Sequence, residues 1–369
     1  MSLPQQPHVP SADGSEPPDM IRPDGKEKGR DMSRPTMRDI GKSVGVSAVT
    51  VSKALAGKPG MSESMRQRIL KKAEELNYHY PEEERRQHRK EQLDIGILIP
   101  EHFFQADSFY AVMYKQLVQQ LTENGHFGML ELLSREMETG LEIPNLVKSN
   151  RVDGLILLGE PEKAYYRMIA RQSLPVLFLD FYDEQASAEA VVGDNAYGCY
   201  RLTSHLIRNG HTNIGFVGSY RATSSIMDRF LGYSRALLSN DLPVREDWVL
   251  PDRDEKGQLL KEIPLPAQMP TAFVCNCDLV AVHLIRTLRA KGLRVPEDIS
   301  ITGFDDFVTG AGAEPELSTF RIDTDAMIDL AVRTIAAKCR GQHKPFGRTV
   351  IGGQPVYRNS DRNINGTEE

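Results

Sequence analysis

Residues 36–80 contain three short helical patterns joined by tight turns, and this segment restricts the possible folds of the chain more than any other. The first pattern begins at Thr36, and Asp39 stands three positions later, the spacing of a capping box. Gly45 ends it, as glycine commonly does where the backbone must turn left-handed. We therefore expect a short, well-delimited helix before a tight turn.

The second pattern follows Ser47, a residue that can cap a helix, and repeats apolar residues one turn apart at Val51 and Leu55. Its opposite face is free of bulky apolar side chains and consists of Ala48, Val49, Ser52 and Lys53. The third pattern follows Ser62, and its apolar stripe is Met65, Ile69, Ala73 and Leu76. Such an arrangement predicts a helix-turn-helix that places its second helix in a DNA groove. The alternative is a small three-helix core with no such partner.

The charge distribution favours a nucleic-acid partner for this segment. Between residues 34 and 90, thirteen Lys and Arg stand against seven acids, a net charge of +6. The whole chain carries −6, and residues 1–33 carry four bases and six acids, so residues from 91 onward carry −10. A basic head on an acidic body is suited to phosphate binding by the head alone.

Residues 34–80 resemble the DNA-binding domain of the lac and galactose repressor family of bacterial transcription regulators. The motifs that carry the resemblance are residues 36–40, 45–47, 50–53, 55–57 and 73–78. By that resemblance, the side chains that read base edges are Ala48, Val49 and Lys53. Those that hold the DNA backbone are Thr36, Ser47, Thr50, Ser52 and Asn77. The chemistry agrees, because Lys53 can donate to guanine while Ala48 and Val49 offer only apolar contact.

Residues 81–92 correspond to the family's hinge or linker. Their charged run contains three adjacent glutamates, 82–84, and the bases Arg85, Arg86 and Arg89, but no large apolar side chain that could wedge between base steps. Two alternatives remain open: a hinge helix that contacts the minor groove, and a charged, solvated linker.

The composition of the whole chain is that of an ordinary globular protein. Its 369 residues, of which 40% are hydrophobic, predict two or three domains. Residues 1–33 have the composition of a disordered tail, and residues 361–369 form a second tail. We find no long apolar run and no signal peptide, and so expect a cytoplasmic protein without membrane contact. Four scattered cysteines predict neither a zinc site nor a disulfide framework, and no cofactor is expected.

From residue 93 onward, short apolar runs alternate with amphipathic helical patterns, which predicts parallel sheets covered by helices. The expected strands are 95–99, 128–133, 154–158, 176–179, 214–217, 272–275 and 299–303. The expected helices are 110–124, 162–172, 197–209, 229–240, 278–291 and 324–340. Seven strands exceed one small sheet, and the natural division is two lobes that bind a ligand between the carboxyl ends of their strands.

The same family resemblance extends over residues 93–360, with markers at 151–156, 175–180, 194–198, 205–211 and 295–306. It implies a small all-α helix-turn-helix head followed by a two-lobed α/β core with parallel sheets, of the periplasmic-binding-protein-like type. Lobe 1 is expected to comprise about 93–191 and 321–350, and lobe 2 about 192–320 and 351–360.

By the resemblance, Asp180, Arg229 and Asp305 lie in the cleft between the lobes and bind a sugar-like effector. Carboxylates accept hydroxyl hydrogen bonds and a guanidinium grips vicinal oxygens, so the residue types suit a polyol. The alternative is that these residues are loop-end charges or helix caps. Cys277 holds the family's usual asparagine position, and Asn276 is a candidate to replace it. Phe104 and Tyr110 are candidates for stacking on a sugar ring, with a plain core role as the alternative.

Together these features predict a homodimeric, sequence-specific transcriptional regulator, expected to be a repressor, that binds double-stranded operator DNA under control of a small sugar. Repression relieved by the ligand is the common outcome in the family, and corepression is the rarer one. A rival hypothesis is a cytoplasmic sugar-binding module that acts through RNA or protein contacts. No catalytic residues are assigned. Asp305 and Asp306 are neighbours on an extended chain, so we expect them to point apart and not to form a catalytic pair.

Overall fold

The computed structural model describes residues 35–55, 60–76, 78, 92–105, 108–255, 257–307 and 315–365. The chain divides into two compact units, a head that includes the described residues up to 78 and a body that includes those from 92. The predicted N-terminal tail, the linker up to residue 91, and Asn77 lie outside the described residues.

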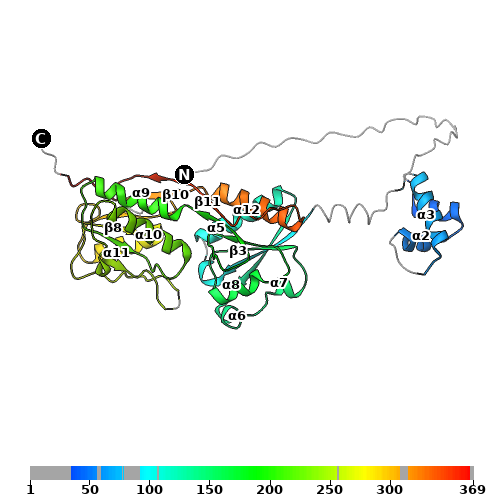
Figure 1. Ribbon diagram of the computed structural model, residues 1–369, viewed down its shortest axis with the longest axis horizontal. Coiled ribbons are helices and arrows are strands. Elements are labelled where there is room, and N and C mark those ends of the chain that lie inside the picture. The colour runs from blue at the N-terminus through cyan, green and yellow to red at the C-terminus, as the bar shows by residue number, and fades with distance from the viewer. Residues whose placement is uncertain are drawn as a thin grey trace, which may run out of the picture. The chain divides into compact units, whose positions relative to one another are not determined.

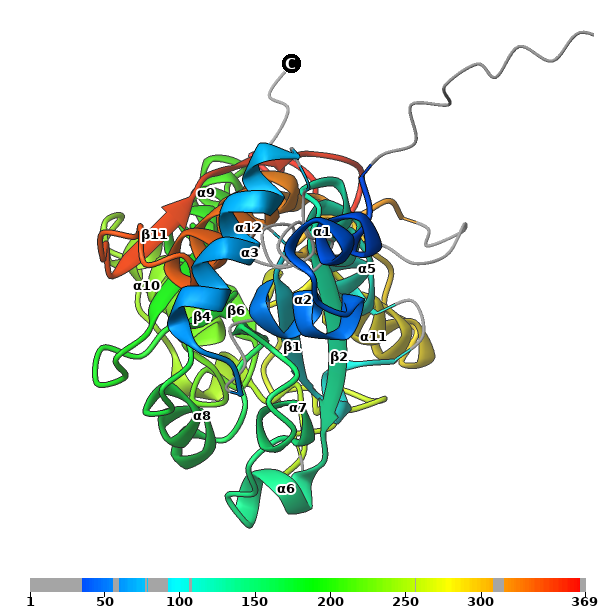
Figure 2. The ribbon, with the colours of Figure 1, turned by 90° about the vertical axis from the view of Figure 1, so that its right-hand side faces the viewer.

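The head consists of three helices, α1 (Met37–Val44), α2 (Ala48–Leu55) and α3 (Glu63–Glu75), labelled in Figure 2. The backbone N–H of Thr36 donates to the Asp39 carboxylate at 2.9 Å, and Gly45 ends α1 with φ 77°. The Ser47 hydroxyl accepts from the N–H of Thr50 at 3.1 Å and so caps α2. The predicted helix boundaries are confirmed.

The three helices enclose one small core. Its buried members are Ile40, Val51, Ala54, Ile69 and Ala73, with Met65, Leu55 and Leu76 packed at its margin. Ala54 was not predicted to be buried, whereas Leu55, predicted to be buried, is only half-buried. The reason is geometric, because α3 packs against the side of α2 that carries positions 51 and 54, three residues apart. Val49 is 66% exposed and Lys53 is exposed, so the predicted outer face of α2 is open to solvent.

The body consists of two lobes, which Figure 1 shows side by side, one around β3 and the other around β8. The sheet of lobe 1 is parallel throughout, with the strand order β11-β5-β4-β3-β1-β2. Its strands are β1 (Asp94–Pro100), β2 (Phe127–Leu133), β3 (Gly154–Leu158), β4 (Val176–Leu179), β5 (Glu189–Gly193) and β11 (Arg348–Ile351). Its helices are η1 (Glu101–Phe103), α5 (Phe109–Glu123), α6 (Arg135–Thr139), α7 (Asn145–Lys148), α8 (Lys163–Ala170) and α12 (Thr324–Cys339).

Helices cover both faces of this sheet because its strands are apolar on both sides. In β3, Ile156 and Leu158 pack in the cluster that contains the inner residues of α5 and α12. Leu155 and Leu157 pack on the opposite face, in the cluster that contains Tyr165 and other residues of α8. Alternate residues of a strand point to opposite faces, so a continuous apolar run fills both layers.

Lobe 2 repeats this design with a four-stranded parallel sheet of order β7-β6-β8-β9. Its strands are β6 (Ile214–Val217), β7 (Val249–Leu250), β8 (Ala272–Cys275) and β9 (Ser300–Thr302). Its helices are α9 (Asn195–Arg208), α10 (Ser224–Leu238), η2 (Glu246–Trp248) and α11 (Asp278–Ala290). Residues of α9 and α10 pack on one face of the sheet and residues of α11 on the other. The predicted two-lobed α/β architecture is confirmed.

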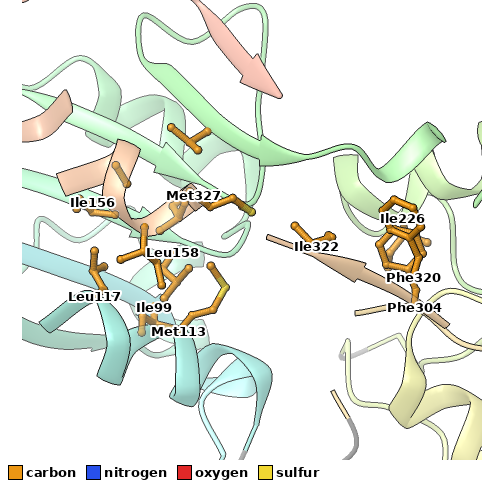
Figure 3. Close-up of a cluster of buried hydrophobic side chains, with 14 of the residues drawn as sticks. Ile99, Met113, Leu117, Ile156, Leu158, Ile226, Phe304, Phe320, Ile322 and Met327 are labelled. Carbon is orange, nitrogen blue, oxygen red and sulfur yellow. The ribbon is translucent and has the colours of Figure 1, made fainter. Parts of the chain in front are cut away.

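The lobes are joined where the chain passes between them, next to an antiparallel pair, β10 (Thr319–Ile322) and β12 (Gly353–Val356). Figure 3 shows Ile322 of β10 between two groups of apolar side chains, with Ile99, Leu158 and Met327 on one side and Phe304 and Phe320 on the other. All these residues belong to one buried cluster. The connection between the lobes is therefore packed as part of the core.

The sequence did not predict β5, β7, β10, β11 or β12. Each lacks a long apolar run: β5 starts with Glu189, β7 has two residues, and β12 contains Gln354 and Pro355. The sequence also placed the start of α10 at Arg229, which is wrong. Thr223 caps the helix, accepting from the N–H of Ile226 at 3.2 Å, so α10 begins at Ser224 and Arg229 lies in its second turn.

Among the described residues, no helix has the length and apolar character needed to cross a membrane. The four cysteines are unpaired, with Cys199 and Cys275 buried and Cys277 and Cys339 half-buried.

We expect the contact of α9 with α10 to be a sensitive point of the fold. A Cβ at Gly232 would lie 2.0 Å from the carbonyl oxygen of Ala196, a backbone atom that cannot move without shifting α9. Gly232→Ala should therefore lower the free energy of unfolding by at least about 2 kcal/mol, as measured by urea denaturation of the purified chain.

Gly352→Ala is the matched control, because a Cβ there meets no atom within 4 Å. Its free energy of unfolding should stay within about 0.5 kcal/mol of the unaltered chain. Equal stabilities for the two variants would contradict the close approach of α9 and α10.

Candidate functional site

Polar side chains of the body gather where parallel strands of both sheets end. In each sheet the strand order reverses at one strand. In lobe 1 the chain passes from β1 to β2 on one side and then to β3 on the other, and in lobe 2 it passes from β6 to β7 on one side and then to β8 on the other. Such switch points leave a crevice at the carboxyl ends of the strands. In lobe 1, Glu160 and Asp180 follow the ends of β3 and β4, and Tyr110 lies in the first turn of α5. In lobe 2, Asp252, Asn276 and Asp305 follow the ends of β7, β8 and β9, and Arg229 lies in the second turn of α10.

Arg229 is the centre of this group and is only 5% exposed. Its Nε donates to Oδ1 of Asn195 at 2.8 Å, its Nη1 to the carbonyl oxygen of Asn276 at 2.6 Å, and its Nη2 to Oδ1 of Asp305 at 3.0 Å. The guanidinium carbon also lies 4.0 Å from the centre of the Phe304 ring. Every nitrogen of the side chain is engaged, so its orientation is fixed.

Asp180 lies opposite, in lobe 1, and is 3% exposed. Its Oδ2 accepts from the Tyr110 hydroxyl at 2.8 Å, whereas its Oδ1 is buried and has no hydrogen-bond partner among the described residues. Burial raises the pKa of Asp180 to about 6, although the nearby Arg229 opposes this. A buried carboxylate oxygen without a donor carries a desolvation cost that a ligand hydroxyl can relieve.

The predicted residues thus fall into two groups. Tyr110, Asp180, Arg229, Asn276 and Asp305 are linked by hydrogen bonds or by charge across the two lobes. Phe104 instead packs edge-on against Tyr114, with ring centres 5.7 Å apart, while its neighbour Phe103 lies 5.1 Å from Tyr110. Asn276 contributes its carbonyl oxygen to Arg229, and its side-chain amide points the other way, to Asp252 at 2.5 Å.

Sequence reasoning missed Asp252 and Arg253. Asp252 is completely buried and binds Arg253 with both oxygens, Nε to Oδ1 at 3.1 Å and Nη2 to Oδ2 at 2.8 Å. The two residues follow β7, a strand of only two residues that the apolar pattern did not reveal. Recognition of β7 would have placed them at a strand end like the others.

Asp305 and Asp306 point apart, as expected, but the expected reason is wrong. Their backbones are not extended: both residues have positive φ, 95° and 52°. Asp305 binds Arg229, while Asp306 accepts from Arg321 Nε and Arg358 Nη2, each at 2.6 Å. The left-handed turn, held by three arginines, separates the two carboxylates.

A cavity of about 620 Å³ opens beside this cluster. Its lining combines α5, the turn 305–307 and the connecting segments near 321–325 and 352–354. Of the six candidate residues Asp305 alone contributes to this lining, while Asp180 and Arg229 lie outside it. The hydrogen-bonded cluster and the cavity are therefore adjacent parts of one region between the lobes.

The first turns of α10 hold lobe 2 to lobe 1 by direct hydrogen bonds. Glu160 of lobe 1 accepts from the N–H and the hydroxyl of Ser224, at 2.7 and 2.8 Å. The Ser225 hydroxyl donates to the carbonyl oxygen of Asp180 at 2.7 Å, and the Tyr182 hydroxyl donates to Asp228 at 2.9 Å. We call these five residues and Asp180 the inter-lobe latch. Because Arg229 follows Asp228 directly, the latch and the buried cluster are mechanically joined.

In the head, the predicted base-reading residues share one surface of α2. Val49 and Lys53 are exposed and Ala48 is partly exposed. Of the predicted backbone-contacting residues, Thr36 and Ser47 are exposed at the helix starts, and Thr50 and Ser52 are partly exposed. Ser47 and Thr50 hydroxyls lie 2.9 Å apart, so they form a small polar group at the start of α2. Within the described residues of the chain, no cluster of His, Cys, Asp and Glu has the makeup of a metal site.

Two family models match the chain. "Bacterial regulatory proteins, lacI family" matches residues 36–80, and "Periplasmic binding protein-like domain" matches residues 203–360. The chain is 27% identical over 313 residues to the HTH-type transcriptional repressor PurR of Aliivibrio salmonicida, covering 84% of this chain and 93% of the relative. It is 26% identical over 328 residues to the ribose operon repressor of Haemophilus influenzae, covering 88% and 98%.

Solved structures share the fold. A transcriptional regulator CelR–cellobiose complex aligns with TM-score 0.62 at 23% identity, covering 89% of this chain and 100% of that one. A lac repressor dimer bound to operator and the anti-inducer ONPF aligns with TM-score 0.61 at 21% identity, covering 89% and 99%. A LacI family transcriptional regulator from Enterococcus faecium with bound ribose aligns with TM-score 0.59 at 20% identity, covering 74% and 100%.

The raised pKa of Asp180 has a measurable consequence for stability. Because its pKa is about 6 in the folded chain against an ordinary value of 3.8, the folded state binds more protons between these values, and the contribution of Asp180 to stability falls as pH rises. Asp180→Asn removes this dependence. The free energy of unfolding of the variant minus that of the unaltered chain should be about 2 kcal/mol larger at pH 7.5 than at pH 4.5.

The measurement is urea denaturation of both proteins at the two pH values. Asp241→Asn, at an exposed turn position with φ 54°, is the control and should give the same difference from the unaltered chain at both pH values. An Asp180→Asn difference that does not change with pH would contradict a buried, destabilised carboxylate.

Proposed function

Because this chain belongs to the lacI family of bacterial regulatory proteins, we propose that it is a transcriptional repressor whose operator affinity is controlled by a small sugar-like effector held between the two lobes of its body. The observation that carries the effector part is the buried, unpartnered Oδ1 of Asp180, which lies where strand ends of lobe 1 face the Arg229 cluster of lobe 2. A sugar hydroxyl supplies the missing donor.

The head supports operator recognition by the surface of α2. Lys53 donates to base edges, and Ala48 and Val49 provide apolar contact, for example with a thymine methyl group. Thr36, Ser47, Thr50, Ser52 and Asn77 hold the DNA backbone, and the net charge of +6 on residues 34–90 supplies the salt-dependent part of the affinity. Phosphate contacts fix the register, and the few base contacts select the sequence.

We propose that the chain acts as a homodimer on a roughly palindromic operator. One head with three base-reading side chains binds weakly, whereas two linked heads raise each other's effective concentration and require two half-sites at a fixed spacing. One of the similar solved structures is a lac repressor dimer bound to operator, which supports this arrangement.

The effector acts by changing the balance between closed and open lobes. It binds between Asp180 of lobe 1 and the Arg229 cluster of lobe 2, so it contacts both sides only when the lobes are closed. The latch favours the same closed state, because Glu160, Tyr182 and the carbonyl of Asp180 bond to α10 across the gap. A ligand shifts this balance by its difference in affinity for the two states, and operator affinity shifts with it. Release of repression by the effector is the outcome we propose.

The protein has no catalytic role in this proposal, and it works in the cytoplasm, where its operator is. The relatives are repressors: PurR and the ribose operon repressor. Ribose and cellobiose are the first sugars to test, since two of the similar solved structures contain them. The rival function, a sugar-binding module that contacts RNA or protein, lacks the sequence-specific duplex binding that the following experiment measures.

Selection of bound duplexes from random DNA by the purified chain should yield a palindromic consensus. Lys53→Ala should then relax the base preference at one position of each half-site. It should weaken binding to the consensus duplex by about 1–3 kcal/mol more than binding to a mismatched duplex. Electrophoretic mobility shift at fixed salt measures both affinities.

Lys71→Ala on α3 is the matched control, because it removes the same charge from an exposed helix position. It should weaken binding to consensus and mismatched duplexes equally, because only a phosphate contact is lost. If Lys53→Ala behaved in the same way, base reading by Lys53 would be wrong. If no duplex were enriched at all, the rival function would be favoured.

The latch predicts an effect on effector affinity at a distance. Tyr182→Phe removes the 2.9 Å hydrogen bond to Asp228 and so destabilises the closed lobes by about 0.5–1.5 kcal/mol. Effector affinity, measured by calorimetry with a panel of neutral sugars that includes ribose and cellobiose, should fall about 2- to 10-fold, and operator release should need correspondingly more sugar.

Tyr197→Phe is the control, since Tyr197 is 43% exposed on α9 and its hydroxyl accepts from Arg201 within lobe 2. It should leave the sugar affinity unchanged. An unchanged affinity for Tyr182→Phe as well would mean that the Tyr182–Asp228 bond does not stabilise the ligand-binding state.

A further inference from the structure

Arg253 is a second guanidinium in the region between the lobes, and its position is fixed by a rigid support. It is bound through Nε and Nη2 to Asp252. Asp252 in turn accepts from the N–H of Ser219 at 2.8 Å and from the amide of Asn276 at 2.5 Å. The carbonyl of the same Asn276 binds Arg229 at 2.6 Å. The two arginines are thus connected through one residue and cannot reorient independently.

One nitrogen of this side chain is available for a ligand. Arg229 has protein acceptors on all three nitrogens, but Arg253 uses only Nε and Nη2, both on the edge that faces Asp252. Among the described residues, no acceptor is bonded to its Nη1. The Arg253 side chain as a whole is 12% exposed, so this donor belongs to a largely buried group. An unpartnered acceptor, the buried Oδ1 of Asp180, lies on the other lobe.

Tyr110 lies near both groups. Its hydroxyl donates to Asp180, and it makes a small contribution to the raised pKa of Arg253. Burial lowers the pKa of Arg253, but Asp252 more than offsets this, with smaller contributions from Cys277 and Tyr110. Cys277 remains a neutral thiol, because burial raises its pKa to about 12. Arg253 is thus joined to the buried cluster through Asp252, Asn276 and Arg229, and the unpartnered acceptor of Asp180 lies on the lobe 1 side of that cluster.

Arg135 of lobe 1 brings a second cation to the segment that follows Arg253, where its Nη2 donates to the carbonyl oxygen of Glu255 at 3.5 Å. Burial, Arg253 and Arg135 together lower the pKa of His102, which stands at the carboxyl end of β1. Asp252 and Arg253 form a neutral pair through two hydrogen bonds, and Nη1 is the donor that this pair leaves for a ligand. An unused guanidinium N–H binds carboxylate or phosphate oxygens more strongly than neutral hydroxyls.

We propose that the effector is an anionic sugar derivative, with hydroxyls at Asp180 and a carboxylate or phosphate group at Nη1 of Arg253, so that Arg253 sets the chemical class of ligand. The inference rests on the proposed function, because it assumes that an effector occupies the region between the lobes. It adds to that function a residue that selects among sugars by charge.

The test is calorimetry of the full chain with matched ligands: glucose, glucuronate and glucose 6-phosphate, and ribose and ribose 5-phosphate. We expect at least one anionic compound to bind tenfold or more tightly than its neutral parent. The glucuronate and phosphate arms separate the two possible anionic groups. Arg253→Gln should remove this preference by weakening the anionic ligand at least tenfold while the neutral parent changes less than twofold.

Three further variants separate recognition from structure. Arg253→Lys keeps the charge and should retain part of the preference. Asp252→Asn/Arg253→Gln removes both charges, so no buried carboxylate is left unpaired, and it should behave like Arg253→Gln. Arg245→Gln is the control, since Arg245 is paired with Asp247 on the surface of the same lobe, and it should keep the preference intact.

Different results overturn different statements. If neutral sugars bind but each anionic derivative binds equally well or more weakly than its neutral parent, the proposal of an anionic effector is wrong and the proposed function stands. If Arg253→Gln and the double variant weaken neutral and anionic ligands to the same extent, Arg253 is a structural residue and does not select the ligand. If no sugar of either kind binds the folded chain, the proposed effector site fails together with this inference.

Discussion

The arrangement of the loops around the site in the body depends on one buried cation, Arg229, which requires hydrogen-bond acceptors. Arg229 is 5% exposed, and a guanidinium removed from water is tolerated only with its nitrogens bonded. Its acceptors come from three separate parts of lobe 2: Asn195 at the start of α9, the carbonyl of Asn276 after β8, and Asp305 after β9. The cation therefore holds three loop ends in one arrangement, and the turn that directs Asp305 toward it depends on a positive φ.

The same cation influences the other lobe. Asp180 lies in a buried position where its charge is disfavoured, and Arg229 only partly compensates. The inter-lobe latch joins the two by bonding Ser225 to the carbonyl of Asp180, one helical turn before Arg229. Movement of the lobes relative to each other must change these bonds together. If a ligand binds Asp180, as we propose, its binding is coupled to closure of the lobes through these bonds.

Much of the fold could be predicted from the sequence because it follows from local pattern. The apolar runs at 154–158 and 214–217 became β3 and β6 with those bounds, and the caps Thr36 and Ser47 set the ends of α1 and α2. The sequence did not predict the strands that lack an apolar run. Because β7 is one of them, Asp252 and Arg253 were not recognised as residues that follow a strand. The start of α10 was misplaced because its cap, Thr223, precedes the apolar periodicity that identified the helix.

The sequence by itself determined the longer helices, the strands that contain an apolar run and the charge contrast between head and body. By resemblance it also named Asp180, Arg229 and Asp305 as candidate cleft residues. Periodicity and capping are properties of neighbours along the chain, so they can be read from it. Only the tertiary structure decided that Asn276 presents its carbonyl to Arg229 and its amide to Asp252, that one oxygen of Asp180 is left unpartnered, and that Arg253 pairs with Asp252. These depend on which strand ends meet, and that is set by packing between residues far apart in sequence.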